Sequence, residues 1–239
     1  MNEATHLLAT DLDGTLVGDQ AGLQELLDFY EQQPYEVGLI YITGRHLASA
    51  RQLIADEGLP IPQALVTDVG TEIYTGPDFQ KDEDWEARLM DEWKPEYVEA
   101  LAKTIDGLTP QDLPVTSRRS FHVIDVQAVD QFRALLEAQS VPHKLIFSGG
   151  KDLDILPPAS GKGEALRYLL ERHGMSDAKL LVAGDSGNDL EMLTLGFPSV
   201  IVGNAQPELK KHEEHPLIFR ANRHCAGGIY EAWNHFHTD

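Results

Sequence analysis

The chain has 239 residues, enough for one large domain or two small ones, and its hydrophobic share of 42% is that of a globular protein with a buried core. Acidic residues outnumber basic ones by 39 to 19, which gives a formal net charge of -20. This charge argues against nucleic acid and anionic membranes as partners, and it requires any site for a phosphate group to be locally positive.

The cysteine content and the first residues of the chain indicate in which cellular compartment the protein is expected. Cys225 is the only cysteine, so no disulfide can form within the chain, which is compatible with the cytoplasm. Residues 1–5 lack the basic region of a signal peptide, and no apolar run approaches the length of a membrane span. We therefore expect a cytoplasmic protein without a membrane partner.

The first expected strand, residues 7–10, is a short apolar run that ends at the sequence DLDGT. In open α/β sheets, chemistry collects beyond the carboxyl ends of the strands, which is where Asp11 and Asp13 leave this strand. Two carboxylates this close repel each other unless a proton or a cation lies between them. The stretch indicates a nucleophile, an acid–base carboxylate and a hard metal ion, with a solvated turn as the alternative.

The next segments alternate between helix and strand. We expect a helix at 23–31, a strand at 37–42, a helix at 46–57, a strand at 64–68, and a turn with a short extra strand at 70–74. This alternation predicts a parallel sheet with right-handed crossovers. The second strand ends at Thr43 and Gly44, whose hydroxyl and amide would lie at a helix N-terminus that favours anions; a plain N-cap is the alternative.

Residues 79–156 are predicted to form a second α/β module inserted into the first. Its expected helices are 95–105 and 128–138, and its expected strands are 120–125, 144–148 and 153–156. Half-exposed strands with alternating polarity predict an antiparallel sheet with one solvated face. The first module then comprises residues 1–78 and 157–239, because three parallel strands with an open edge make a poor core.

The first module resumes with a helix expected at 161–173. Lys162 lies in its first turn, where the helix dipole disfavours a cation, so we expect an anion or a carboxylate nearby. The strand expected at 179–183 ends in the sequence GDSGND, which again places carboxylates at a strand end. A strand at 199–202, an edge strand at 216–220 and a helix at 227–236 complete the predicted chain.

Two further groups are predicted to be structural. His212 and His215 are three residues apart, which is not the spacing of a zinc-protease helix, and the glutamates between them indicate a solvated face. Cys225 has His224 beside it but no sign of a third, orienting partner, so we interpret it as a partly buried structural thiol.

Polar groups from several strand ends and helix starts thus share one predicted edge of the sheet. Asp11 is the expected nucleophile and Asp13 the acid–base group, while Lys162, Thr43 and the amides after Thr43 stabilise the phosphoryl oxygens. Oxygen ligands suit Mg²⁺, whose expected ligands come from Asp11, Asp185 and a backbone carbonyl near Asp13. The full set of expected metal positions is Asp11, Asp13, Asp185 and Asp189, with Asn188 as a further phosphate or substrate contact.

These residues carry a resemblance to a known family. The sequence DLDGT, the strand end at Thr43, Lys162 and the sequence GDSGND resemble, in order, the four motifs of haloacid dehalogenase-like phosphatases. The size and α/β character of the insertion resemble the large cap of sugar-phosphate phosphatases. The resemblance implies a Rossmann-like core with a parallel sheet, an inserted α/β cap and Mg²⁺-dependent cleavage of a sugar phosphate.

A closer resemblance covers most of the chain. The segments LVGDQ, ITGR, VGTEIY, IFSGGKDLDILP, LVAGDSGNDLEML, IVGNAQPEL and HCAGGIYEA are similar to bacterial and plant sucrose-phosphate phosphatases. That family hydrolyses sucrose 6-phosphate to sucrose and phosphate, the last step of sucrose synthesis. One departure is Gly14-Thr15-Leu16, where members of the family often have Asn-Thr-Trp.

For the sugar, we expect contacts where the cap and the core face each other. The expected sugar contacts are Arg45, Thr71, Glu72, Lys151, Asp152 and Asp154, with Arg118, Arg119 and His122 as weaker candidates from the cap. Polar side chains around hydroxyl groups discriminate well, because a wrong sugar leaves them unpaired. Ordinary solvated hairpin charges are the alternative. Hinges for cap motion are predicted near residues 76–77 and 157–158.

Other functions remain open at this level. The substrate could be another glycosyl-sugar phosphate, such as mannosylfructose phosphate, or a hexose phosphate. A non-catalytic partner of a sugar-phosphate synthase could retain the fold, although four repelling or misplaced charges have no use in a scaffold. An enzyme that associates with a sucrose-phosphate synthase is a further expectation. A phosphomutase would need a way to exclude water, which the sequence does not reveal.

Overall fold

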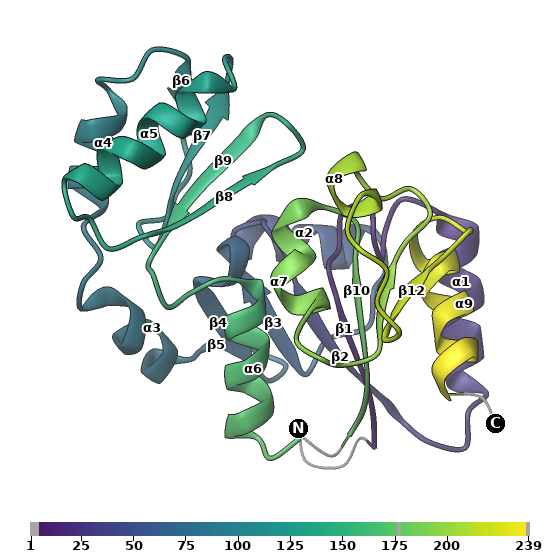
Figure 1. The fold of residues 1–239 in the computed structure, drawn as a ribbon. Coiled ribbons are helices and arrows are strands. Elements are labelled where there is room, and N and C mark those ends of the chain that lie inside the picture. Colours follow the sequence, from purple (N-terminus) through teal and green to yellow (C-terminus); the bar gives the residue numbers. More distant parts are fainter. Residues whose placement is uncertain (1–4, 176–177, 238–239) are drawn as a thin grey trace.

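The structure, a computed structural model, describes residues 5–175 and 178–237 (Figure 1). Its larger sheet has the strand order β12-β11-β10-β1-β2-β3-β4-β5. These strands are β1 (His6–Thr10), β2 (Val37–Ile42), β3 (Ala64–Thr67), β4 (Glu72–Thr75), β5 (Gln80–Lys81), β10 (Lys179–Gly184), β11 (Ser199–Ile201) and β12 (Ile218–Arg220). Strands β12 to β3 run parallel, whereas β4 and β5 are antiparallel. The predicted parallel sheet is therefore confirmed.

Helices cover both faces of this sheet (Figure 1). They are α1 (Gln20–Glu31), α2 (Leu47–Asp56), α3 (Glu83–Met90), α6 (Lys162–Arg172), α7 (Leu190–Leu193), α8 (Pro207–Lys210) and α9 (Cys225–His237). One face packs against α1, α2 and α9, where Trp233 is fully buried, and the other packs against α3, α6 and α7. Successive strand residues alternate between the two faces, so Leu7 joins one core and Leu8 the other.

Helix starts follow the capping chemistry of the sequence. Asp19 accepts a hydrogen bond from the Gly22 amide at 3.2 Å, so α1 begins earlier than the expected residue 23. The α6 helix begins at Lys162, after Gly161 in a positive-φ conformation. Gly70 has a φ of +92° and lies against Gly161, where a Cβ would overlap the backbone. This close approach brings the end of β3 next to the start of α6.

The second sheet has the order β6-β7-β9-β8 and is antiparallel throughout, as predicted. Its elements are α4 (Pro95–Ala102), β6 (Leu108–Pro110), β7 (Arg119–Val123), α5 (Gln127–Ala138), β8 (Lys144–Ser148) and β9 (Asp152–Leu156). The two helices pack on one face, where Phe121 and Phe132 make an edge-to-face contact with ring centroids 5.7 Å apart. In Figure 1 this module stands above one end of the larger sheet.

The side-chain packing indicates that the inserted module begins at a later residue than the sequence pattern predicted. Strand β5 pairs with β4 of the larger sheet, and Trp85 and Leu89 of α3 are buried in a core of that sheet. Trp93 is the first residue whose buried side chain belongs to the core of the second sheet. We therefore propose that the cap begins near residue 91 rather than at the expected residue 79.

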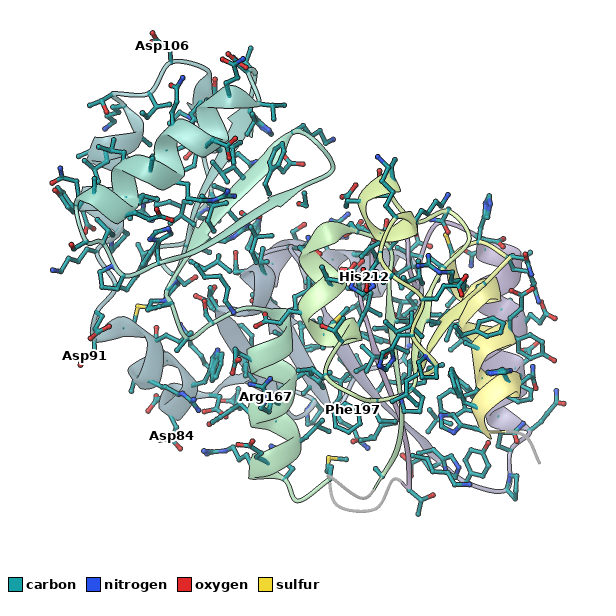
Figure 2. The ribbon with its side chains drawn as sticks, in the orientation of Figure 1. Asp84, Asp91, Asp106, Arg167, Phe197 and His212 are labelled. Atoms are coloured by element: carbon teal, nitrogen blue, oxygen red, sulfur yellow. The ribbon has the colours of Figure 1, made fainter. Side chains whose placement is uncertain are left out.

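Surface features agree with the acidic composition. Figure 2 places Asp84, Asp91 and Asp106 at the periphery of the molecule, away from the space between the two sheets. Among the described residues, no helix combines the length and the apolar composition that crossing a membrane requires. Residues 1–4, on which the expectation of a missing signal peptide rests in part, lie outside the described residues.

Candidate active site

Three adjacent strands deliver the predicted motif residues to one edge of the larger sheet. Asp11 follows β1, Thr43 follows β2, and Asp185 follows β10, which pairs with β1 on its other side. The Asp11 amide donates to the Ala183 carbonyl at 3.0 Å, which extends the strand pairing as far as the carboxylates. The parallel order therefore brings together residues that lie more than 170 positions apart.

Lys162 lies buried among carboxylates at this edge. Its Nζ donates to Asp11 Oδ1 and to Asp189 Oδ1, each at 2.6 Å, and its side chain is only 1% exposed. Although burial lowers the pKa of Lys162, the two carboxylates outweigh burial and raise it above its usual value. The ammonium is thus held charged, and the anionic neighbours expected for this lysine are present.

Asp189 anchors the loop that follows β10. Its Oδ2 accepts the backbone amides of Asp185 and Ser186, each at 3.0 Å, while its Oδ1 accepts from Lys162. The Asp189 side chain is fully buried. Both oxygens are engaged, so Asp189 orients the loop and the lysine in this structure.

A buried acidic group at this edge could bind a metal. Carboxylate oxygens of Asp11, Asp185 and Asp189 lie within 4.8 Å of one another, and they form the only group among the described residues that could hold a metal in this way. Burial and the neighbouring Asp189 raise the pKa of Asp185 to about 7, and burial likewise raises the pKa of Asp11. An all-oxygen donor set with this crowding fits a hard divalent cation, which would offset the repulsion.

Asp13 occupies a different place from the other predicted metal ligands. Both of its carboxylate oxygens accept from Arg45, at 2.7 Å to Nε and 2.7 Å to Nη2. The Asp13 carboxylate therefore lies outside the acidic group, and a metal contact through the backbone carbonyl near Asp13 stays a prediction. The bidentate pair instead places an acid–base candidate and a cation on the same wall of the cavity.

A cavity of about 540 Å³ lies between the edge of the larger sheet and the second module. Its walls come from both modules: Asp11, Asp13, Gly44, Arg45, His46, Ser49, Val69, Asp185, Ser186, Asn188 and Gln206 from the core, and Gln111, Leu113, Arg118, Ser148, Gly149, Lys151, Asp152 and Asp154 from the cap. Five aspartates face three cationic side chains in this lining. The lining alone is thus not locally positive, as a phosphate site must be, and this excess of carboxylates is a further reason to expect a bound cation.

The cavity includes most of the expected substrate contacts. Gly44, Arg45, Lys151, Asp152, Asp154 and Asn188 line it, whereas Thr43 lies fully buried behind Gly44. The Thr43 hydroxyl accepts the Arg45 amide at 3.1 Å in a local turn. The N-cap of α2 is His46, whose Nδ1 accepts the Ser49 amide at 3.4 Å, so the N-cap alternative for Thr43 is wrong. Among the described residues, the Lys151 ammonium has no hydrogen-bond partner, which leaves it free for a ligand.

Thr71 and Glu72 are not among the residues that line the cavity, so their expected role as sugar contacts stays a prediction. The Thr71 hydroxyl donates to the Asp68 carbonyl at 2.9 Å and lies 3.0 Å from the Ser117 hydroxyl. Glu72 accepts from the Tyr74 hydroxyl at 2.5 Å and lies 3.5 Å from Lys81, on β4 and β5.

Of the three weaker sugar-contact candidates in the cap, one lines the cavity and two do not. Arg118 lines the cavity and is buried. Arg119 lies in a neighbouring hollow and faces Glu99 at 3.5 Å, and His122 is exposed with its Nδ1 3.2 Å from Asp152.

Glu213, Glu214 and His215 are exposed, as expected for a solvated face, and Cys225 is buried. Nδ1 of His212 lies 3.0 Å from the Glu213 carbonyl, and Nδ1 of His215 accepts the Leu217 amide at 3.2 Å. Neither residue belongs to a metal-binding group among the described residues, and Figure 2 shows His212 over the core module. The Cys225 thiol is buried, and burial raises its pKa.

Several lining residues escaped the sequence analysis. Gln111 follows β6 and donates to Asp152 Oδ1 at 3.1 Å, but its segment shows no periodicity that would reveal it. His46 and Ser49 follow Arg45 on the first turn of α2, so helical spacing from Arg45 could have found Ser49, which accepts from Arg45 at 2.8 Å. Asn204, which does not line the cavity, also escaped the sequence analysis; it donates to the Gly14 carbonyl at 2.7 Å and so holds the loop of the first motif.

Gly14 offers a direct test of the loop geometry. It has a φ of +80°, and a Cβ at this position would lie 2.8 Å from Asp185 Oδ2. Gly14→Ala is expected to lower both stability and turnover, because alanine adds backbone strain of ~1–3 kcal/mol at this positive φ, which asparagine, the residue often found here in the family, tolerates. Turnover and thermal unfolding check this. Gly58→Ala, also at positive φ but with no atom within 4 Å, isolates the backbone term and is expected to affect stability alone.

Sheet order and the inserted second sheet give the chain the fold of haloacid dehalogenase-like hydrolases. The sequence model of the sucrose-6F-phosphate phosphohydrolase family matches residues 4–237. The chain therefore belongs to the sucrose-6F-phosphate phosphohydrolase family.

Individual relatives agree with this assignment. The chain is 36% identical to the sucrose-phosphatase of Synechocystis sp. PCC6803, whose crystal structure in complex with sucrose and phosphate it matches with a TM-score of 0.90, covering 99% of this chain and 98% of that one. It is 34% identical to sucrose-phosphatase 1 of Nicotiana tabacum, over 96% of this chain and 59% of that protein. It is 30% identical to the mannosylfructose-phosphate phosphatase of Agrobacterium fabrum, over 96% of each. The chain spans only 30% and 59% of the first two curated relatives that it matches.

Proposed function

We propose that this protein hydrolyses sucrose 6-phosphate to sucrose and phosphate in a Mg²⁺-dependent reaction. The observation that carries the proposal is one cavity lined both by the Asp11 edge of the core and by Lys151, Asp152 and Asp154 of the cap. One part suits a phosphoryl group and the other a polar sugar. Family membership and the likeness to a structure that holds sucrose and phosphate support this choice of sugar.

In the proposed reaction, a carboxylate oxygen of Asp11 attacks phosphorus and the bond between phosphorus and the sugar oxygen breaks. Asp13 gives its proton to the leaving sugar oxygen, which departs as the alcohol. Asp13 then takes a proton from water, whose oxygen attacks phosphorus and releases Asp11 and inorganic phosphate. Arg45 holds Asp13 in the structure, so a protonated Asp13 requires this pair to part when substrate enters.

The remaining groups act by charge and position. Lys162 and the amides that follow Thr43 would stabilise the phosphoryl oxygens during transfer, an effect for which removal of one donor typically costs about 3–4 kcal/mol. Asp11 and Asp185 would hold Mg²⁺, with Asp189 behind them. The cation would supply positive charge against the repulsion between these carboxylates and the incoming phosphate.

The test is phosphate release from a substrate panel. The panel contains sucrose 6-phosphate, mannosylfructose phosphate, trehalose 6-phosphate, glucose 6-phosphate and fructose 6-phosphate, each with Mg²⁺ and with EDTA. We expect sucrose 6-phosphate to give the highest kcat/KM. Better turnover of another sugar would retain the Asp11 mechanism and overturn the sugar, because the cap contacts and the core motifs are separate residues.

Metal dependence has its own expected result. EDTA should abolish turnover, and added Mg²⁺ should restore it, because the acidic group is crowded and its pKa values are raised without a cation. Unchanged activity in EDTA would overturn the metal assignment. Mg²⁺-dependent protection of the folded state in thermal unfolding, lost in Asp185→Asn, gives a readout independent of turnover.

The first alternative, hydrolysis of another glycosyl-sugar phosphate, is favoured by the relative named for mannosylfructose phosphate, which matches this chain over 96% of both lengths. The panel separates the two. We also retain cytoplasmic location and association with a sucrose-phosphate synthase as proposals. Co-sedimentation of the purified pair, with and without substrate, tests the association.

A further inference from the structure

A buried charge cluster joins the two modules beside the cavity. Arg118, in the loop before β7 of the cap, donates from Nε to Asp68 Oδ1 at 3.1 Å and from Nη2 to the Gly44 carbonyl at 2.8 Å. Its Nη1 donates to Asp154 Oδ1 at 2.7 Å. One guanidinium thus contacts the end of β3, the loop after β2 and a cap strand that lines the cavity. Its planar fork suits several directed bonds at once.

Asp68 is the core half of this cluster, and its side chain is fully buried and does not line the cavity. It sits in an unusual turn: Asp68 and Val69 have φ values of +52° and +58°, which are uncommon for residues other than glycine and especially for a β-branched one. The Asp68 amide donates to the Arg45 carbonyl at 2.9 Å and the Val69 amide to the Thr43 carbonyl at 3.1 Å. This strained turn thus hydrogen-bonds to residues 43–45, the proposed phosphate loop, and its Asp68 carboxylate accepts from Arg118 of the cap.

Resting on the proposed function, we infer that Asp68 is a positioning residue that, through Arg118, fixes the cap's sugar-facing side chains relative to the Thr43–Arg45 phosphate loop. Asp68 touches no substrate in this arrangement. It acts by holding the guanidinium that binds both the Gly44 carbonyl and Asp154. Breaking this tie would let the sugar part and the phosphate part of the cavity move apart.

Other contacts between the modules are weaker candidates for this role. Glu208 of α8 accepts the Gly149 amide at 3.0 Å at the tip of the β8–β9 hairpin, and both residues are exposed. Lys144 of β8 pairs with Glu191 at 2.8 Å with both side chains partly exposed. Exposed pairs are screened by water and salt. The side chains of the Arg118 cluster are at most 8% exposed, so its geometry sets the relative position of the modules more strongly.

The test uses Asp68→Asn, which keeps an acceptor for Arg118 and removes the charge. Asp68 Oδ2 has no hydrogen-bond partner among the described residues, so the amide nitrogen of asparagine displaces none and the fold should be retained. We expect kcat/KM for sucrose 6-phosphate to fall about 10- to 100-fold, while turnover of p-nitrophenyl phosphate, which needs no sugar contact, stays within about threefold. Arg133→Gln, an exposed cap arginine paired with Asp130, is the matched control and should change neither.

A substrate-free readout separates this proposal from the function on which it rests. Spin labels on Asp106→Cys in the cap and Arg167→Cys on α6, which Figure 2 shows on opposite modules, report the distance between cap and core. We expect Asp68→Asn and Arg118→Lys to broaden the distance distribution and Arg133→Gln to leave it unchanged. An unchanged distribution in Asp68→Asn, or equal losses on both substrates, would overturn the proposal. Failure of the wild type on sucrose 6-phosphate would overturn only the sugar.

Discussion

Asp11→Asn is expected to abolish phosphate release, with a loss of at least about 10⁴-fold in kcat, because removal of a covalent nucleophile leaves only binding and charge stabilisation. Asparagine keeps the shape of the side chain and can still accept from Lys162, whose Nζ lies 2.6 Å from Asp11 Oδ1. The measurement is phosphate release from sucrose 6-phosphate with Mg²⁺, together with acid-quench trapping of radioactive phosphate on the protein.

The stability of this variant provides its control. Burial raises the pKa of Asp11, so the ionised carboxylate is held there at a cost, and an uncharged amide should unfold at a similar or higher temperature. A folded but inactive protein without trapped phosphate supports the nucleophile. Substantial turnover by a folded Asp11→Asn protein would contradict it. If the folded Asp11→Asn protein still binds a synthase and sucrose synthesis continues at the same rate, a scaffold function would be favoured instead.

Lys162→Met is expected to have the second large effect, on stability as well as on activity. It removes the partner of two carboxylates, one of which, Asp189, is fully buried. Breaking one side of a buried ion pair destabilises proteins by ~3–5 kcal/mol, because a charge is left without compensation. We expect a lower unfolding temperature at pH 7 and no measurable turnover.

A surface lysine and a pH series make the Lys162 test specific. Lys103→Met is the same substitution at an exposed ion pair with Glu99. It should alter the free energy of unfolding by less than ~1 kcal/mol. In Lys162→Met, the orphaned carboxylates can be neutralised by protons, so the stability deficit should shrink as the pH is lowered. A deficit that is equal at pH 5 and pH 8 would contradict the buried-charge explanation.

Sequence reasoning located the catalytic edge because strand ends can be read from short apolar runs. Residues 37–42 formed a strand with the expected bounds, since an apolar run between a proline and a small polar turn allows little else. Once β1, β2 and β10 are parallel, Asp11, Thr43 and Asp185 must meet at one edge. The core of the candidate site therefore followed from topology and side-chain chemistry.

The cap contacts were less predictable because they depend on backbone direction and on non-periodic segments. Nothing in the residue types at Asp68 and Val69 signals two successive positive φ values, so the side-chain directions of Thr71 and Glu72 could not be derived. Gln111 follows a three-residue strand with no alternation to reveal it. Helix α3 carries only Trp85 and Leu89 as buried anchors on an acidic background, which hid its packing against the core.

The discontinuous order of the larger sheet has a consequence for folding during synthesis. Strand β1 lies between β2 and β10, and β10 begins only at Lys179. At about 5–20 residues per second, the ribosome needs roughly 10–40 s to synthesise the chain as far as residue 190. Asp11 and Asp13 therefore exist for about that time before Asp185 and Asp189 are available to complete the site. The inserted module has its own buried cluster around Phe121 and Phe132 and emerges earlier. The part that would select the sugar can thus fold before the part that would cleave the phosphate is complete.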